Sequence, residues 1–124
     1  MKKFIFFGIV LVVSLSLFNC GNGTGKTPAN PRDAADMYIK AAQSGDVKAV
    51  ENLSTERYKK RAEKEVRRFK KFSKWTLTKL ETETESEGTW HAFHYQCEKT
   101  SGGTEEVIVA VLEKDGKYLV GDID

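Results

Sequence analysis

The chain has 124 residues, 31% of them charged, and a formal net charge of +2 at pH 7. This length allows one small domain and leaves no room for a second. A net charge so close to zero gives no indication of a nucleic-acid partner. The two cysteines and two histidines lack the spacing of metal ligands, so we expect neither a metal site nor a cofactor.

The first twenty residues have the pattern of an export signal. Two lysines precede an unbroken apolar run over residues 4–13. This run is too short to span a membrane comfortably, which takes about 20 apolar residues, but it fits the apolar region of a signal peptide. The next residues, LFNC at 17–20, resemble the lipobox of bacterial lipoproteins, although phenylalanine and asparagine stand where that motif has small residues.

The resemblance implies that residues 1–19 are a lipoprotein signal peptide and that Cys20 is the first mature residue. Cys20 is then expected to carry a diacylglyceryl thioether and an acylated amine, for example a palmitoyl amide. Such acyl chains would anchor the protein in the inner or outer membrane of the cell envelope, with its domain outside the cytoplasm. The alternatives are an ordinary signal peptide cut at another bond and an uncleaved anchor. Residues 20–30, rich in Gly, Asn and Thr, are expected to form a flexible tether after the lipidated cysteine.

Residues 31–124 are expected to form a single α+β domain that begins with helices. Asn30 and Pro31 are typical of a helix start, because asparagine caps free N–H groups and proline needs no donor there. Ser44-Gly45 predicts the end of this helix, and Asp46 can cap a second, short helix. The apolar stripe of the first helix follows the spacing i, i+3, i+4 and i+7; it consists of Ala34, Met37, Tyr38 and Ala41.

A third helix is expected to start at Ser54 or Thr55 and to run through Phe69, with Phe72 and Trp75 continuing the same spacing. Its apolar positions are Tyr58, Ala62, Val66 and Phe69. Its other faces are almost entirely Lys, Arg and Glu.

Charge is divided unevenly along the chain. Residues 54–74 hold ten basic and three acidic side chains, whereas residues 75–124 hold four basic and eleven acidic ones. The basic helix can contact anionic lipid or an acidic partner. A run of this kind is more often a solvated helical face, and we favour that interpretation.

Four extended runs follow, at residues 75–86, 89–100, 105–114 and 117–124. Turn signals separate them, namely Glu87-Gly88, Ser101-Gly102-Gly103 and Asp115-Gly116. Such short connections predict an antiparallel meander with one face packed on the helices.

Alternation divides the second run between two faces. Phe93, Tyr95 and Cys97 fall on one, and Trp90, Ala92, His94 and Gln96 fall on the other. If Cys20 is lipidated, Cys97 has no disulfide partner and is expected to be a small buried apolar residue. In the first run, Glu81, Glu83 and Glu85 share a face, which we expect to be solvated or to lie opposite the basic helix.

The segment PRDAADMYIKAAQSGDVKAVENLS at residues 31–54, with an aromatic residue in mid-helix and Gly-Asp after the first helix, resembles the start of nuclear-transport-factor-2-like (NTF2-like) and polyketide-cyclase-like domains. Together with the lipobox, it resembles small bacterial lipoproteins of unknown function with this fold, also described as cystatin-like. The resemblance covers residues 29–124. It implies N-terminal helices packed on a curved four-stranded antiparallel sheet that wraps them into a cone.

An enzymatic function is one hypothesis. Polyketide-cyclase-like or ketosteroid-isomerase-like enzymes place a base and a proton donor in the cone. Candidate residues are His91, His94, Tyr38, Tyr58 and Tyr95. Because the two histidines are three residues apart on a strand, they fall on opposite faces and do not form a pair.

The favoured hypothesis is a non-catalytic binding or interaction module, because the sequence holds no paired catalytic groups. In a binding module, Tyr38, Trp90 and His94 are the candidate contacts for a small apolar or peptide ligand. Aromatic residues are usually buried in the core, which favours a purely structural role for Tyr38 and Trp90. In an interaction module, the tethered domain docks on an envelope protein through the basic helix or the acidic strand.

Overall fold

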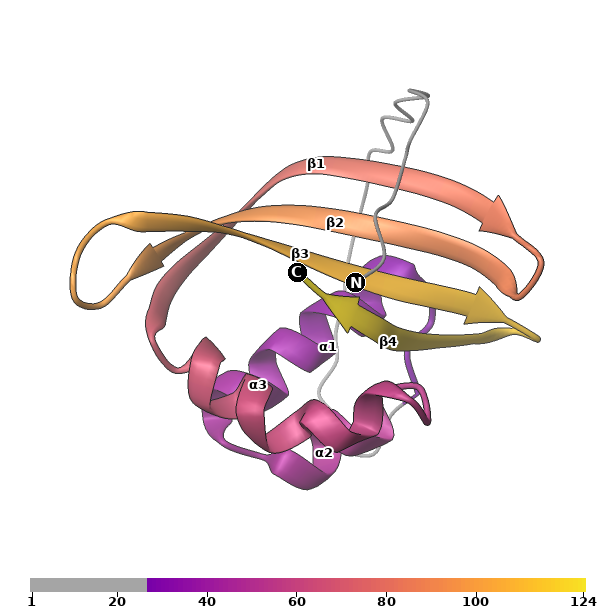
Figure 1. Ribbon diagram of the computed structural model, residues 1–124, viewed down its shortest axis with the longest axis horizontal. Coiled ribbons are helices and arrows are strands. Elements are labelled where there is room, and N and C mark those ends of the chain that lie inside the picture. Colours follow the sequence, from indigo (N-terminus) through magenta and orange to yellow (C-terminus); the bar gives the residue numbers. More distant parts are fainter. Residues whose placement is uncertain (1–26) are drawn as a thin grey trace.

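The computed structural model describes residues 27–124, so the predicted signal peptide, Cys20 and most of the predicted tether lie outside the described residues. Helices precede strands, as predicted for an α+β domain (Figure 1). The helical part comprises α1 (Pro31–Ser44), α2 (Val47–Asn52), the 3₁₀ turn η1 (Tyr58–Arg61) and α3 (Ala62–Phe69). The sheet comprises β1 (Phe72–Glu85), β2 (Gly88–Lys99), β3 (Thr104–Lys114) and β4 (Lys117–Ile123).

The ends of the first two helices follow local capping rules. The side chain of Asn30 accepts a hydrogen bond from the Asp33 N–H at 2.7 Å, and Pro31 opens α1. Gly45 ends α1 with φ of 83°, a left-handed conformation that glycine adopts without strain. Asp46 then caps α2 by accepting from the Ala49 N–H at 3.1 Å. These predicted boundaries are confirmed.

The third helical segment differs from the prediction. Thr55 is one of the two predicted caps, and its Oγ1 accepts a hydrogen bond at 3.3 Å from the N–H of Tyr58, the first residue of η1. The segment starts as a 3₁₀ turn and ends at Phe69, so Phe72 and Trp75 belong to β1 instead of continuing the helix. A register shift between Phe72 and Lys74 places both aromatic rings against Phe69 despite their odd spacing. Tertiary packing therefore overrides the helical spacing.

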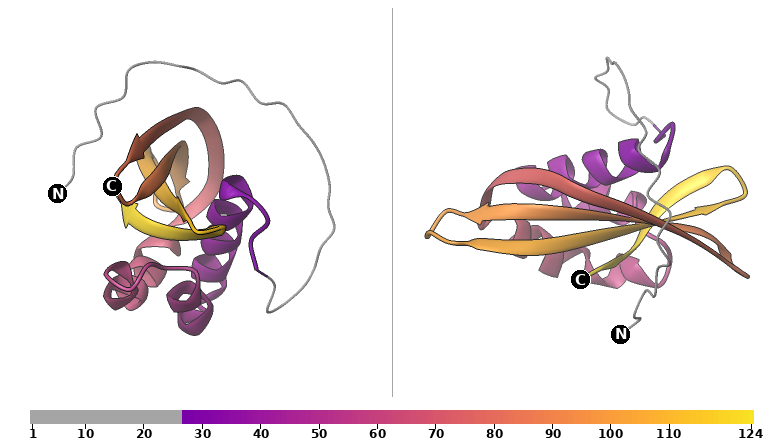
Figure 2. Two further views of the ribbon diagram at one scale, coloured as in Figure 1. Left: turned by 90° about the vertical axis from the view of Figure 1, so that its right-hand side faces the viewer. Right: turned by 90° about the horizontal axis from the view of Figure 1, so that it is seen from above.

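The four strands form one antiparallel sheet in the predicted order β1-β2-β3-β4. Asp115 and Gly116 make the β3–β4 turn with positive φ values of 53° and 75°, as a two-residue hairpin requires. Register shifts interrupt β1 twice, and the pairing of β3 with β4 once. Such irregularities bend strands, and Figures 1 and 2 show the long strands curving over the helices. The curved four-stranded sheet is thus confirmed.

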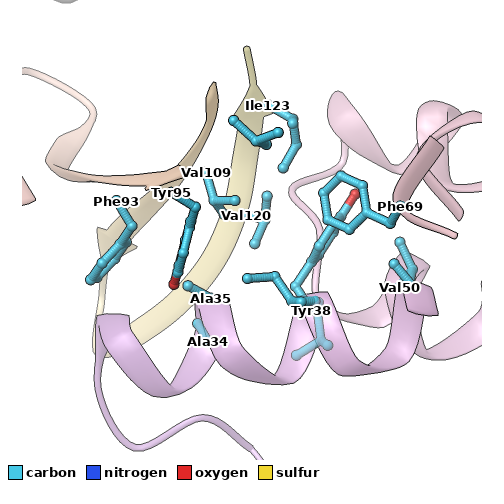
Figure 3. Packing of buried hydrophobic residues seen from close by; sticks show 14 of the residues in the cluster. Ala34, Ala35, Tyr38, Val50, Phe69, Phe93, Tyr95, Val109, Val120 and Ile123 are labelled. Atoms are coloured by element: carbon cyan, nitrogen blue, oxygen red, sulfur yellow. The ribbon is translucent and has the colours of Figure 1, made fainter. Parts of the chain in front are cut away.

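The core lies between the helices and one face of the sheet, which we call the inner face. Ala35 of α1 lies beside Tyr95 of β2, whereas Tyr38 of α1 points towards Phe69 of α3 (Figure 3). On the other face, the outer face, a smaller buried group stands apart from this core: Trp90, Ala92 and Ala110. The predicted alternation of β2 between two faces is confirmed. No helix within residues 27–124 has both the length and the apolar character for crossing a bilayer.

Candidate functional site

A continuous row of aromatic rings runs through the core between the helices and β1. We call it the aromatic row; its members are Tyr38, Phe69, Phe72, Trp75 and Tyr95. Phe69 is at its centre, with ring centroids 5.8 Å from Tyr38 and 4.8 Å from Trp75. Trp75 in turn meets Tyr95 edge to face at 5.6 Å. These are the tilted and T-shaped geometries that aromatic rings prefer.

Two polar groups of the row have no protein partner. The Tyr95 hydroxyl and the Nε1 of Trp75 are buried and make no hydrogen bond within residues 27–124, whereas the buried Tyr38 hydroxyl has the Ser54 side chain beside it. A buried polar group without a partner costs about 1–3 kcal/mol, so native proteins rarely keep one without a reason. Here two unpaired groups belong to neighbouring rings of one row.

The two tyrosines of the row are hydrogen-bond donors at neutral pH. Burial, followed by the nearby charge of Glu65, raises the pKa of Tyr38 well above its ordinary range. Burial, followed by the charge of Asp36, raises the pKa of Tyr95 in the same way. Both phenols therefore stay protonated, and neither can act as a base near pH 7.

The row reaches the surface beside β1. This edge strand begins beside α3, and its later part lies farthest from the helices in Figure 1, whereas α1 packs chiefly on β3 and β4 among the strands. Four apolar side chains of α1 and β1 pack against the core but remain partly exposed: Met37, Ala41, Leu77 and Leu80. We call these residues, with Tyr38, Trp75 and Tyr95, the inner site.

A second polar group lies beside the row and is tied into the helices. Tyr58 donates a hydrogen bond to Glu65 Oε2 at 2.5 Å, and Glu65 is only 3% exposed. Arg68 lies 3.8 Å from the other oxygen of Glu65 and also binds Glu105 of β3 at 2.9 Å. Burial, and then the bond to Glu65, raises the pKa of Tyr58 far above normal. This group joins α3 to the sheet, and Tyr58 is committed to it.

The outer face holds a histidine between two carboxylates. Nε2 of His94 lies 2.6 Å from Glu81, and Nδ1 lies 3.1 Å from Glu106. Glu81 also pairs with Lys79 at 3.3 Å. A neutral imidazole has only one N–H, so both nitrogens can donate to carboxylates only in the imidazolium form.

The outer-face tryptophan is also engaged. Its Nε1 donates to Glu87 at 2.8 Å. A Cβ built on Gly121 would lie 2.5 Å from the Trp90 ring, so the indole covers this glycine of β4. Trp90 therefore closes the outer face rather than lining the core.

The three predicted ligand contacts do not meet. Tyr38 lies in the core on the inner side of the sheet, whereas Trp90 and His94 lie on the outer face, as residues of β2 that alternate with Phe93 and Tyr95. A single pocket built from Tyr38, Trp90 and His94 is therefore not formed. The alternation of residues along β2 assigns them to two faces of the sheet but does not indicate which face packs against the helices.

The acidic strand also differs from expectation. Glu81 and Glu83 lie on the outer face, away from α3, opposite Ala92 and Trp90 in the register. The side chain of Glu81 is only 16% exposed, and one oxygen of Glu83 is buried without a partner. These glutamates are thus neither fully solvated nor opposite the basic helix, because neighbouring side chains on the twisted sheet cover them.

The other predicted candidates have simple placements. His91 falls on the inner face and pairs with Glu113 at 2.8 Å, so the two histidines lie on opposite faces, as predicted. Cys97 is buried, and this burial raises its pKa to about 12, as expected for an inert thiol. Within residues 27–124, no three His, Cys, Asp or Glu side chains are placed to hold a metal ion.

Sequence reasoning missed two residues of interest. Trp75 stood at the predicted border between helix and strand, and only the pairing of β1 with β2 brings it to Tyr95. Glu65 had a usable signal, since it falls between Ala62 and Phe69 on the apolar side of an amphipathic helix. A carboxylate at such a position predicts a buried polar partner.

Comparisons with known proteins agree with this fold. The family described as "Domain of unknown function (DUF4878)" matches residues 20–124. Among solved structures, a designed NTF2-like protein with five substitutions, Rd1NTF2_05, is similar with a TM-score of 0.54 at 13% identity, over 75% of this chain and 93% of its own. No curated protein matches the sequence. At this identity the structural likeness concerns the fold alone.

Proposed function

This chain belongs to the family described as a domain of unknown function (DUF4878), and from its NTF2-like fold and its inner site we propose that it is a lipid-anchored protein of the bacterial cell envelope whose domain binds a small, largely apolar ligand without catalysing a reaction. The anchor is acylated Cys20, and the ligand occupies the inner site. A protein partner in the envelope is the second form of the same non-catalytic role.

The single observation that supports a ligand is the unpaired polar ends of the aromatic row. Trp75 and Tyr95 each keep a buried donor without a partner. A ligand that brings acceptor oxygens to these donors removes their desolvation cost. An apolar surface with a few convergent polar groups is the usual composition of a small-molecule site.

The same donors define the chemistry of the ligand. An indole N–H can only donate, and the raised pKa of the tyrosine keeps its phenol protonated. The ligand therefore carries acceptors, such as carbonyl or carboxylate oxygens. Aromatic rings and the apolar side chains Met37, Leu77 and Leu80 suit a ring or an acyl chain as its body.

The proposed anchor is supported by the amino-terminal sequence. Two lysines, a short apolar run and LFNC at residues 17–20 together favour lipidation at Cys20 over an ordinary cut. Mass spectrometry of the protein purified from native membranes tests this. A mature chain that starts at Cys20 with added acyl mass is expected, and an unmodified sulfur at Cys20 in a freely soluble protein would contradict it.

An enzyme with its site in the cone is the alternative, and one observation favours it. His91 and Glu113 form a histidine–carboxylate pair on the inner face. This pair lies two residues along β2 from Phe93, in the direction away from Tyr95 and the aromatic row. A ligand extracted with the protein that is recovered chemically changed, with the change lost in His91→Gln, would establish the alternative.

The binding test uses decanoate as a probe that joins an acyl chain to a carboxylate. The full chain in lipid nanodiscs is titrated with decanoate, and binding is followed by tryptophan fluorescence and native mass spectrometry. We expect Tyr95→Phe to weaken binding about fivefold to tenfold, because one hydrogen bond is lost. Trp75→Phe, followed by mass spectrometry, is expected to have a similar effect.

Trp90→Phe is the matched control, because the chain has two tryptophans and Trp90 lies on the outer face. This variant leaves Trp75 as the sole fluorescent indole, and its affinity for decanoate should equal that of the unchanged chain. An equal loss of affinity in Trp90→Phe and Trp75→Phe would place binding outside the inner site. No saturable binding of decanoate, and no small molecule retained from cells, would contradict the ligand proposal.

A further inference from the structure

A row of cations runs along the solvent side of the third helical segment. We call it the cationic stripe; it consists of Lys60, Lys64, Arg67 and Lys71. Lys64 and Arg67 are three positions apart in α3, as neighbours on one side of a helix are; Lys60 precedes them in η1, Lys71 follows the end of α3, and all four are exposed. The buried residues of η1 and α3 lie on the opposite side of the segment: Tyr58, Ala62, Glu65, Val66 and Phe69.

The rest of the domain does not neutralise this stripe. Within residues 27–124, no carboxylate lies within the 4.0 Å ion-pair distance of its four cations. Of the nearby acids, Glu56 pairs with Lys59 while Glu65 and Glu105 both pair with Arg68. Glu63, exposed in the first turn of α3, is the nearby acid of the described residues that offsets part of the charge of the stripe without an ion pair to it. The stripe is therefore available to an external anion.

The acidic half of the chain faces the other way. Glu81 and Glu106 flank His94 on the outer face of the sheet, and the helices pack on its inner face (Figure 1). The helical side of the domain is consequently cationic and the outer face acidic. Such polarity orients a protein near a charged surface.

The chain enters the domain on the helical side. In the left view of Figure 2, the indigo segment that precedes α1 starts level with α2 and α3 and then runs along α1. The predicted tether of ten residues, 21–30, reaches at most about 33–36 Å when extended. An anchor at Cys20 therefore holds the helical side within reach of the lipid headgroups.

We propose that the cationic stripe docks the domain onto anionic phospholipid headgroups, so that the helices face the bilayer and the outer face of the sheet faces away. This inference rests on the lipid anchor of the proposed function, because the tether supplies the high local concentration that a weak contact needs. Each Lys or Arg near an anionic surface favours docking by about fivefold. Four aligned cations are thus enough for a predominantly docked state.

Lysine reactivity measures docking directly. The full chain is reconstituted in vesicles of phosphatidylcholine alone or with phosphatidylglycerol, and each lysine is titrated with an amine reagent and quantified by mass spectrometry. We expect Lys60, Lys64 and Lys71 to react at least fivefold more slowly in the anionic vesicles. Lys114 and Lys117, exposed at the β3–β4 turn, should react equally in both. High salt should remove the protection, because it screens the headgroup charge.

Two charge-reversal variants separate docking from anchoring. Lys64→Glu/Arg67→Glu should abolish the protection of Lys60 and Lys71, whereas Lys114→Glu/Lys117→Glu, with the same change in net charge, should keep it. Equal protection in both vesicle types, or equal loss in both variants, would overturn the docking proposal. Flotation with neutral vesicles reports the anchor alone, so a chain that floats without protection of its stripe refutes docking while leaving the anchor intact. A chain that does not float at all refutes the anchor.

Discussion

Strand β2 presents polar groups to two faces of the sheet, and the two faces treat them differently. On the inner face, His91 pairs with Glu113, but the Tyr95 hydroxyl and the neighbouring Trp75 Nε1 are buried without partners. On the outer face, both nitrogens of His94 meet glutamates and Trp90 donates to Glu87. Only one oxygen of Glu83 interrupts this pattern of pairing on the outer face of the described residues.

The difference has a physical origin in what covers each face. The inner face packs against the buried side of α1, whose residues there are mainly small and apolar, such as Ala34, Ala35 and Ala42. These side chains offer no acceptors to Tyr95. The outer face borders water, so long glutamates can turn towards its donors. Pairing therefore indicates a structural role on the outer face, while the unpaired donors on the inner face are the groups assigned to the proposed ligand.

The largest expected effect is the loss of stability when the core at the inner face is disrupted. Phe69 is fully buried at the centre of the aromatic row, and Phe69→Ala should lower the free energy of unfolding by about 3–5 kcal/mol, because it leaves a cavity. Urea unfolding followed by circular dichroism measures this. Lys64→Ala on the exposed side of the same helix should change stability by less than about 0.5 kcal/mol. Similar losses in the two variants would mean that the row is not the core.

The next effect tests the closure of the outer face by Trp90. A Cβ on Gly121 would lie 2.5 Å from the Trp90 Cη2, so Gly121→Ala should cost about 1–3 kcal/mol through overpacking. The shorter side chain of Trp90→Leu makes room, so the double variant should lose less than the sum of the two single losses. Urea unfolding of all four proteins checks this cycle. Strictly additive losses would show that the indole does not cover Gly121.

Local signals allowed much of the fold to be predicted from the sequence. Asn30, Gly45 and Asp46 act through backbone geometry within a few residues, and the Asp115-Gly116 turn does the same. Such capping and turn residues can be recognised in the sequence without knowledge of the tertiary structure. The predicted first and last residues of the four strands were therefore close to those observed.

The inner site could not be predicted in the same way. Phe72 and Trp75 fit a helical spacing and also fit a strand with an irregular register, and only packing against Phe69 decides between them. The proposed group of Tyr38, Trp90 and His94 was wrong as one site, because alternation does not reveal which face the helices cover. Lipidation at Cys20 lies outside the described residues and stays a prediction.

A matched pair of tyrosine variants sharpens the contrast between paired and unpaired hydroxyls. Tyr58→Phe removes the donor to the buried Glu65 and should cost about 1–2 kcal/mol, because a buried carboxylate loses a partner. Tyr95→Phe removes a hydroxyl that has no partner, so stability without ligand should be unchanged or slightly higher. Thermal unfolding of both variants in ligand-free protein compares them. A larger loss in Tyr95→Phe would disprove the assignment of its hydroxyl as unpaired.

The smallest effect concerns the protonation of Asp122, which lies opposite Ala110 on the outer face. Burial, and then the charge of Asp124, raises its pKa, while a hydrogen bond from the Ile123 backbone and the charge of Arg61 act in the opposite direction. A carboxyl with a raised pKa in the folded state stabilises the fold when protonated. Its contribution is complete below the ordinary value of 3.8 and is lost as the pH rises through the folded-state pKa.

Asp122→Asn stays neutral and should therefore raise the free energy of unfolding at pH 7 relative to the unchanged chain. The gain should be below about 1 kcal/mol, because solvent screens this partly exposed group. At about pH 3 the native aspartate is protonated as well, so the difference should shrink towards zero. Urea unfolding at the two pH values measures both quantities. A gain that is the same at both would mean that the carboxylate charge is not its cause, and a loss at pH 7 would mean that Arg61 outweighs burial at this position of the outer face.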